Sequence, residues 1–431
     1  MPEMRRVRLL HLSGPIMITG HNDLHEPIET RQDMSSTPAP TAPARDFNWL
    51  ALMPFMLHAV LLQYITSVTR VTTSYRAIEL DLPLFWYGLI SSGYALLPIF
   101  LAVPLGRYID KGNDAKTIWM GSGLTLASNV AFWLWSDGPL QLVGFTVLTG
   151  IGQLFLMAGH QIYSVRCAGP AGRESVFGNY MVALAVGQMG GSLTISWLAD
   201  GQRVPPTATL FLLALAAAVA LFVIGFAMRP EQLSQQEKVR PPSTPVRELL
   251  KVPGLVSVII ASVVTVSSVD LLIAYLPLLA IERHIDAGQV GIMLTIRAVA
   301  AIFARVFYAP LLGLFGRVST TLVSMLAGAV GFFVLALPLP VGFMYFGIAL
   351  LGMGLGFSIT LCLSNVVDLA PVAARGTAMT MRITGNRMGQ FIVPFGASLV
   401  ASASGVGAIL LLIGLALAAS GVAVRMAYAR R

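Results

Sequence analysis

Charged residues are scarce in this chain. Asp, Glu, Lys and Arg make up 11% of its 431 residues, whereas a soluble domain carries about 25%. Apolar residues account for 56%, and the mean hydropathy is +0.76. Such a chain cannot cover itself with a water-exposed surface. The composition therefore excludes an ordinary soluble protein and indicates a protein embedded in a lipid bilayer.

Several catalytic and metal-binding patterns are also missing. The two cysteines, Cys167 and Cys362, suggest neither a disulfide framework nor a metal site. No predicted span contains a His-Glu-x-x-His motif, and the chain has no serine-nucleophile motif, paired-aspartate site or ATP-binding loop. We therefore expect no enzymatic activity, no cofactor and no metal. Without an ATP-binding loop, any energy that the protein uses would have to come from an ion gradient.

The first 47 residues lack a sustained apolar run. Arginines near the start resemble the beginning of a signal peptide, but no apolar core follows them. Residues 35–45 are rich in Ser, Thr, Pro and Ala, a composition typical of a flexible segment. We interpret residues 1–47 as a disordered cytoplasmic tail and Met34 as a candidate alternative start.

Long apolar runs are abundant in the remainder of the chain. A helix needs about 20 apolar residues to cross a bilayer, and it satisfies its own backbone groups where lipid offers no partner. The sequence therefore predicts an all-α polytopic membrane protein with twelve transmembrane helices. Their expected ranges are 48–73, 85–105, 116–135, 140–166, 174–199, 207–228, 254–280, 288–312, 318–337, 341–364, 376–400 and 405–424.

The second half of the chain repeats the first at an interval of about 202 residues. The matching positions are Gly150 with Gly352, Gly152 with Gly354, Arg173 with Arg375, Gly187-Gln188 with Gly389-Gln390, and Gly88 with Gly291. The repeat predicts two six-helix bundles, 48–228 and 254–424, joined by a proline-rich cytoplasmic linker, 229–253. In duplicated transporters the binding site lies between the repeats.

Positive charges indicate the orientation in the membrane. Most of the 28 Lys and Arg fall in the N-terminal tail, the linker, residues 425–431 and the other loops on the same side. Such an excess marks the cytoplasmic face. We counted Arg70, Arg76, Arg203 and Arg283 on the opposite side. Both termini are thus expected in the cytoplasm of a bacterial inner membrane, and the net charge of +8 need not imply nucleic-acid binding.

The segment after the second predicted helix carries the most specific family resemblance. It reads Gly106-Arg107-Tyr108-Ile109-Asp110-Lys111-Gly112. With the twelve helices, the repeat and the linker, it resembles the major facilitator superfamily over residues 48–425. The family pattern G-x-x-x-D-[RK]-x-G is kept except that the second glycine comes one position early, and its second-half counterpart is reduced to Gly316-Arg317. The resemblance implies alternating access, with Gly106, Asp110 and Lys111 bracing the halves on the cytoplasmic side.

Two further signatures of the family are incomplete. The glycine series of exporters is matched at Gly178, Gly187 and Gly191, but Ser192 stands where that series has proline. Plain helix packing explains these glycines equally well. Thr146 stands where proton-driven drug antiporters have an arginine. A proton-driven exporter of hydrophobic compounds therefore stays open as an alternative, with a weaker case.

Charges inside predicted spans are the best pointers to chemistry, because each is costly in lipid. At 1.5 Å per residue, Arg297 and Arg387 reach the same depth near the midplane from opposite faces. Arginine suits a carboxylate or phosphate, so both are candidate anion-binding residues. Asp270 lies near the depth of Arg297. The two would form either a structural pair or a pair that proton uptake by Asp270 releases.

The remaining candidates are polar groups placed on the cavity-lining helices or near their ends. His58 is a second candidate for proton coupling. Expected lining residues are Gln63, Tyr64, Gln188, Asn386 and Gln390; expected cytoplasmic gate residues are Arg166, Arg305, Asp368 and Arg382.

These observations predict a secondary active transporter of a small molecule. We favour an organic anion because four intramembrane arginines outnumber one deep acid. The expected partners are the substrate, the lipid bilayer and a coupling ion, H⁺, and we expect a monomer. A membrane sensor with a transporter-like fold is the alternative from another class. It is disfavoured because neither the tail nor the linker is long enough to form a soluble domain.

Overall fold

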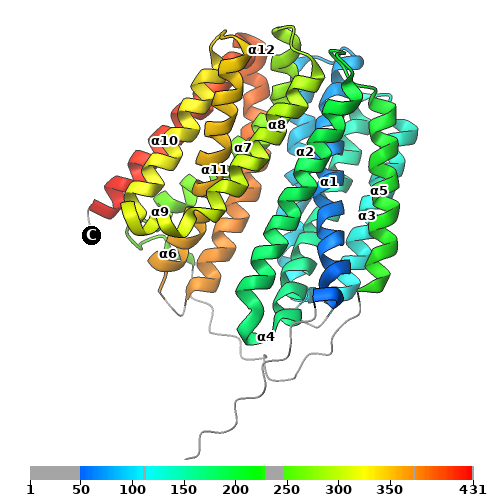
Figure 1. Ribbon diagram of the computed structural model, residues 1–431. Coiled ribbons are helices and arrows are strands. Elements are labelled where there is room, and N and C mark those ends of the chain that lie inside the picture. Colours follow the sequence, from blue (N-terminus) through cyan, green and yellow to red (C-terminus); the bar gives the residue numbers. More distant parts are fainter. Residues whose placement is uncertain (1–48, 110–112, 229–245, 372–373, 430–431) are drawn as a thin grey trace, which may run out of the picture. The chain divides into compact units, whose positions relative to one another are not determined.

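The structure is a computed structural model that describes residues 49–109, 113–228, 246–371 and 374–429. These ranges contain helices and no strands, as the all-α prediction requires (Figure 1). The helices are α1 Trp49–Glu79, α2 Leu84–Ile109, α3 Asp114–Trp135, α4 Pro139–Ala199, α5 Thr207–Ala227, α6 Val246–Leu249, α7 Leu255–Glu282, α8 Ala287–Val306, α9 Tyr308–Phe315, α10 Arg317–Ala336, α11 Val341–Leu369 and α12 Arg375–Ala429.

The twelve-span prediction is confirmed, although two pairs of spans are each continuous. Ten segments are long and apolar enough to cross a membrane, and α4 supplies two of them, Pro139–Ser164 and Gly178–Ala199. The more polar α3 is an eleventh helix of suitable length. The twelfth comes from α12, which combines two predicted spans across a kink at Gly405, whose φ is 77°. We call α1–α5 the N half and α7–α12 the C half.

Several boundaries differ from the sequence prediction. The most important is α1, which continues to Glu79 instead of ending at residue 73. Arg76 secures its last turn: the guanidinium pairs with Glu79 and with Asp137, each at 2.9 Å. The span expected at 288–312 is divided into α8 and α9, and α12 runs past residue 424 to Ala429.

Parts of the predicted organisation lie outside the described residues. These are the tail with Met34, linker residues 229–245, and residues 110–112, which include Asp110 and Lys111. The rest of the predicted linker contains the short helix α6 and the turn that leads into α7.

The halves meet at one end of the bundle and have separate cores at the other. We call the end with residues 79–84 and 282–287 the outer end, and the end with residues 109–114 and 369–375 the cytoplasmic end, following the predicted orientation. One apolar cluster, including Tyr75 and Leu276, contains residues of both halves. The clusters around Phe55 and Val366 each belong to one half. The structure is therefore closed toward the outer end.

Two glycines at equivalent repeat positions allow the close contact between halves. A Cβ on Gly88 of α2 would overlap Ser398 of α12, and a Cβ on Gly291 of α8 would lie 2.7 Å from the Ser192 carbonyl of α4. Cross-half hydrogen bonds reinforce the contact: the Ala287 N–H donates to the Gln202 carbonyl at 3.0 Å. Gly88 and Gly291 thus act as paired contact points, because any side chain there would separate the helices.

Candidate functional site

A cavity of about 850 Å³ lies between the halves. Its wall comes from α1, α2 and α4 of the N half and from α7, α8, α11 and α12 of the C half. It includes residues toward the cytoplasmic end, such as Gln161 and Met379. The volume suits a small organic ligand, since such pockets occupy roughly 300–1,000 Å³. Candidates from the sequence that line it are Gln63, Gln188, Asp270, Arg297, Arg382, Asn386, Arg387 and Gln390.

Asp270 forms its ion pair with Arg70 of α1. The sequence suggests Arg297 as its partner, and that expectation is wrong. An Arg70 guanidinium nitrogen lies 2.5 Å from Asp270 Oδ1, and the two side chains are only 11% and 7% exposed. Arg70 also lies over the Tyr94 ring, 4.4 Å from its centre, a favourable cation–π position. The contact joins α1 of the N half to α7 of the C half.

The predicted position of Arg70 on the outer side is wrong, because α1 runs past the expected end of the first helix at residue 73. The longer α1 places Arg70 nine residues, about 14 Å, before the helix end at Glu79. The polar sequence after residue 72 obscured the helix. The available signal was the absence of glycine and proline between Pro54 and Pro83, which allows one helix to continue through Arg70 and Arg76.

A hydrogen-bonded chain extends from the ion pair into the C half. Gln390 donates its amide to Asp270 Oδ2 at 2.6 Å, and Arg387 donates to Gln390 Oε1 at 3.2 Å. The two carboxylate oxygens of Asp270 are therefore held from opposite halves, one by Arg70 and one by Gln390. A change in the charge of Asp270 affects both contacts at once.

The other arginines of the wall have no acidic partner in the part of the chain that the structure describes. Arg297 is buried and its Nε has no hydrogen-bond acceptor. Arg382 donates to the Ser262 hydroxyl at 3.2 Å, while its Nε is unsatisfied. Arg387 contacts only the neutral Gln390. Arg297 is thus buried, and Arg382 and Arg387 are half-buried, without an ion pair to a carboxylate of the described residues.

Tyr94 of α2 and Arg297 of α8 occupy equivalent places in the two halves. Gly150 of α4 packs against the Tyr94 backbone, and Gly352 of α11 packs against the Arg297 backbone. Both side chains reach the cavity. At equivalent positions, the N half therefore contributes an aromatic ring to the cavity wall and the C half contributes a positive charge.

His58 lies away from the cavity wall, in the interior of the N half. Its Nδ1 lies 2.8 Å from His160 Nε2, and its Nε2 lies 3.2 Å from the Ser122 hydroxyl. Because Ser122 donates its own proton to the Ile118 carbonyl at 2.9 Å, it accepts from His58. His58 then accepts from His160. This fixes both neutral tautomers and leaves His160 Nδ1 as a buried acceptor without a partner.

Other sequence candidates also lie outside the wall. Tyr64 is half-buried and packs against apolar clusters. Arg305 is half-buried near the end of α8, and Gly106 is exposed near the end of α2. Asp368 pairs with Arg317 inside the C half. Arg166 lies on α4, but its side chain is outside the described part. Conversely, Gln153 and Gln161 line the wall but are not among the residues predicted from the sequence.

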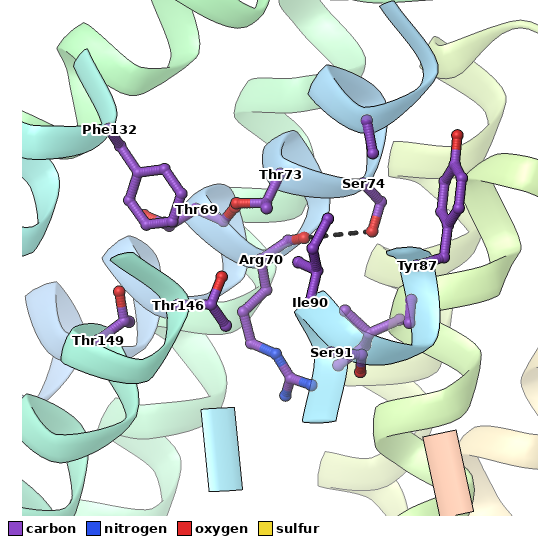
Figure 2. Close-up of a pocket in the computed structure, with 13 residues that line it drawn as sticks. Thr69, Arg70, Thr73, Ser74, Tyr87, Ile90, Ser91, Phe132, Thr146 and Thr149 are labelled. Atoms are coloured by element: carbon purple, nitrogen blue, oxygen red, sulfur yellow. Dashed lines mark hydrogen bonds between the residues drawn. The ribbon is translucent and has the colours of Figure 1, made fainter. Parts of the chain in front are cut away.

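A second and much smaller cavity adjoins Arg70 (Figure 2). Its volume is about 20 Å³, which suits roughly one water molecule. Figure 2 shows the hydroxyl groups of Thr69, Thr73, Ser74 and Thr146 around Arg70. Arg70 lines this cavity as well as the large one. Arg70 therefore lies between the two cavities.

The sequence pattern of the Major Facilitator Superfamily matches residues 47–284 and 258–431. The chain belongs to this family. As a member of the Major Facilitator Superfamily it is an integral membrane transporter whose small-molecule substrate binds within the membrane-spanning bundle. The resemblance noted in the sequence is thereby confirmed. No curated protein matches the chain.

Solved transporters of this superfamily share the fold. The nucleoside transporter NupG superimposes with a TM-score of 0.68 at 13% identity, covering 87% of this chain and 98% of NupG. A bacterial homologue of the human lysosomal transporter Spinster, in an inward-facing and unoccupied conformation, gives a TM-score of 0.69 at 13% identity. That match covers 89% of this chain and 97% of the homologue. At these identities the similarity concerns the fold alone.

Proposed function

We propose that the protein is a secondary active transporter that moves a small organic anion by alternating access, coupled to protons. The observation that carries this proposal is the set of three cavity arginines, Arg297, Arg382 and Arg387, without a carboxylate partner in the described chain. An anion bound among them would offset their charge. A lipophilic cation would increase the repulsion, and a neutral hydrophobic compound would leave the arginines uncompensated.

Asp270 is the proposed proton site. In its charged form it holds Arg70 across the two halves; in its protonated form it loses most of the attraction to that guanidinium. Proton uptake would therefore weaken a contact that must break when the outer end opens. His58 is the weaker candidate, because it lies outside the cavity wall and hydrogen-bonds to His160 and Ser122.

Several organisational features belong to the same proposal. Both termini would face the cytoplasm of a bacterial inner membrane, following the positive-inside bias of the sequence. The functional unit would be a monomer, since one chain contains both walls of the cavity. Transport, and no enzymatic reaction, is the proposed activity.

The deciding experiment measures anion binding to purified protein by thermal shift, with Arg297→Gln and Arg387→Gln as variants. A stabilising ligand raises the melting temperature by mass action. Loss of one charge-assisted hydrogen bond should weaken binding by about 10- to 100-fold. Arg203→Gln is the matched control, because Arg203 is exposed in the loop before α5. Unchanged anion binding by both cavity variants would overturn the anion site.

A further inference from the structure

The cavity has two chemically different walls. In the C half, Arg297, Arg382 and Arg387 contribute three guanidinium groups. Among the described N-half residues of the wall, Arg70 is the only charged one, and Asp270 neutralises it at 2.5 Å. The positive charge that remains available to a ligand is therefore confined to the C half.

The N-half wall is polar but uncharged beyond Arg70. Four glutamines line it: Gln63 on α1 and Gln153, Gln161 and Gln188 on α4. Gln153 donates to Gln63 Oε1 at 3.3 Å, and Thr66 donates to Gln153 Oε1 at 3.4 Å. These contacts are long, and they leave much of the amides' hydrogen-bonding capacity unused.

Two of these glutamines offer their whole amide group to a ligand. The side chains of Gln161 and Gln188 make no hydrogen bond to any described residue, although Gln188 uses its backbone carbonyl to accept from Ser67 and Ser192. A carboxamide both donates and accepts hydrogen bonds. It therefore suits groups that do the same, such as hydroxyl and carboxamide groups, and contributes less to a bare hydrocarbon or an inorganic ion.

We propose, on the basis of the function proposed above, that the substrate is a two-ended dianion. Its two negative charges face Arg297 and Arg387 of the C half, and its hydroxyl- or carboxamide-bearing end faces Gln188 and Gln63 of the N half. Two charges are needed because these two arginines lie deep in the bundle and neither forms an ion pair with a described carboxylate. The neutral end is needed because a ligand without one leaves the glutamine wall unpaired, which costs affinity.

The size and shape of the cavity support the same class. At about 850 Å³ the space far exceeds what a single inorganic anion fills. A compact anion would contact only one wall, and the other wall would remain hydrated. A ligand that contacts both walls also joins the two halves when bound. Ligand binding is thereby coupled to closure of the cytoplasmic end. Only a ligand with both negative charges and hydroxyl or carboxamide groups binds both walls.

The test uses matched pairs of probes that differ by hydroxyl groups, on the full-length protein by thermal shift and by competition in proteoliposomes. The dianion pairs are succinate with malate, adipate with glucarate, and propyl phosphate with glycerol 3-phosphate. The monoanion pair is propionate with lactate. We expect at least one hydroxylated dianion to bind about tenfold more tightly than its partner and than both monoanions.

A glutamine variant locates the effect. Gln188→Leu should remove the advantage of the hydroxylated dianion and leave its partner's binding unchanged. Gln289→Leu, a change outside the wall at the outer end of α8, should preserve that advantage. A melting temperature of Gln188→Leu without ligand within a few degrees of the wild type confirms that the variant is folded. Gln63→Leu provides a second variant if it is not.

The outcomes separate this inference from the function on which it rests. Dianions that bind regardless of hydroxyl groups, or monoanions that bind as tightly as dianions, would overturn the two-ended dianion and leave the anion transporter standing. Binding by none of the anions would overturn both. A hydroxyl advantage retained in both Gln188→Leu and Gln63→Leu would overturn the assignment of the N-half wall.

Discussion

Arg70 of α1 and Asp270 of α7 belong to different halves of the protein, and their side chains meet at 2.5 Å inside the bundle. Arg70 lines both the large cavity and the small one (Figure 2), and Asp270 lines the large one. The other carboxylate oxygen of Asp270 accepts a hydrogen bond from the Gln390 amide at 2.6 Å. A single titratable group thus links the contact between halves to the wall that faces the substrate.

Replacing Asp270 with Asn should make anion binding independent of pH. By the coupling proposed above, protonation of Asp270 frees Arg70 and removes a carboxylate that competes with the ligand for positive charge. Binding of an anion that keeps its charge across the pH range should therefore tighten as the pH falls. Asp270→Asn should bind tightly at every pH. The measurement is the dissociation constant at several pH values, and an unaltered pH slope in the variant would contradict the assignment.

The energetic coupling between Arg70 and Asp270 should appear in a double-mutant cycle. Arg70→Gln and Asp270→Asn each leave one buried charge without its partner, which is strongly destabilising. The double variant has no such charge, so its loss of stability should be smaller than the sum of the single losses. We expect a coupling of about 1–3 kcal/mol. Thermal melting of the four proteins in one detergent gives the comparison, and additive effects would show that the ion pair contributes nothing.

Replacing Gly291 with Val should shift the protein toward a state open at the outer end. The valine would overlap the backbone at Ser192 and push α8 away from α4. A cysteine at Thr73, buried beside the small cavity, reports the change when Cys167 and Cys362 are replaced. Its labelling by an impermeant maleimide added from the predicted outer side should accelerate several-fold. Gly313→Val is the control, since no atom lies within 4 Å of its new Cβ, and equal rates would refute the contact.

Replacing His58 with Leu should lower stability without removing the pH response of transport. The variant loses the hydrogen bonds to His160 and Ser122. The buried His160 N–H is then left without an acceptor, at a cost of about 1–3 kcal/mol, while Ser122 keeps its bond to the Ile118 carbonyl. Melting temperature and pH-dependent uptake are measured on the same proteoliposome preparation. A stable variant with no pH response would transfer proton coupling from Asp270 to the histidine pair.

The sequence was sufficient to predict features that depend only on a residue's position along a helix. Apolar runs predicted the twelve spans, and counting residues placed Arg297, Arg387 and Asp270 deep in the bundle. Residue counting gives the height of a side chain but not the direction in which it points. Asp270 therefore received Arg297 as its expected partner, a residue of similar height on the next helix.

The partner of Asp270 depended on where a helix ends. The last turns of α1 contain polar and charged residues, and Arg76 stabilises them through Glu79 and Asp137. Such tertiary support overrides the hydropathy signal that located the end of the span at residue 73. His58 illustrates the same limit: it was correctly placed midway along a helix, but the sequence did not show that it faces His160 in the interior of one half.

Tyr94 and Arg297 show how gene duplication has shaped the chain. The helix contact beneath each residue is the same, with Gly150 below one and Gly352 below the other, so the two copies offer interchangeable places. Only one place received a charge. Duplication preserved the framework and left the chemistry of each copy free to diverge, and the polarity of the cavity is a product of that divergence. An exchange of the two side chains would move one positive charge to the N half, while Arg382 and Arg387 would stay in the C half.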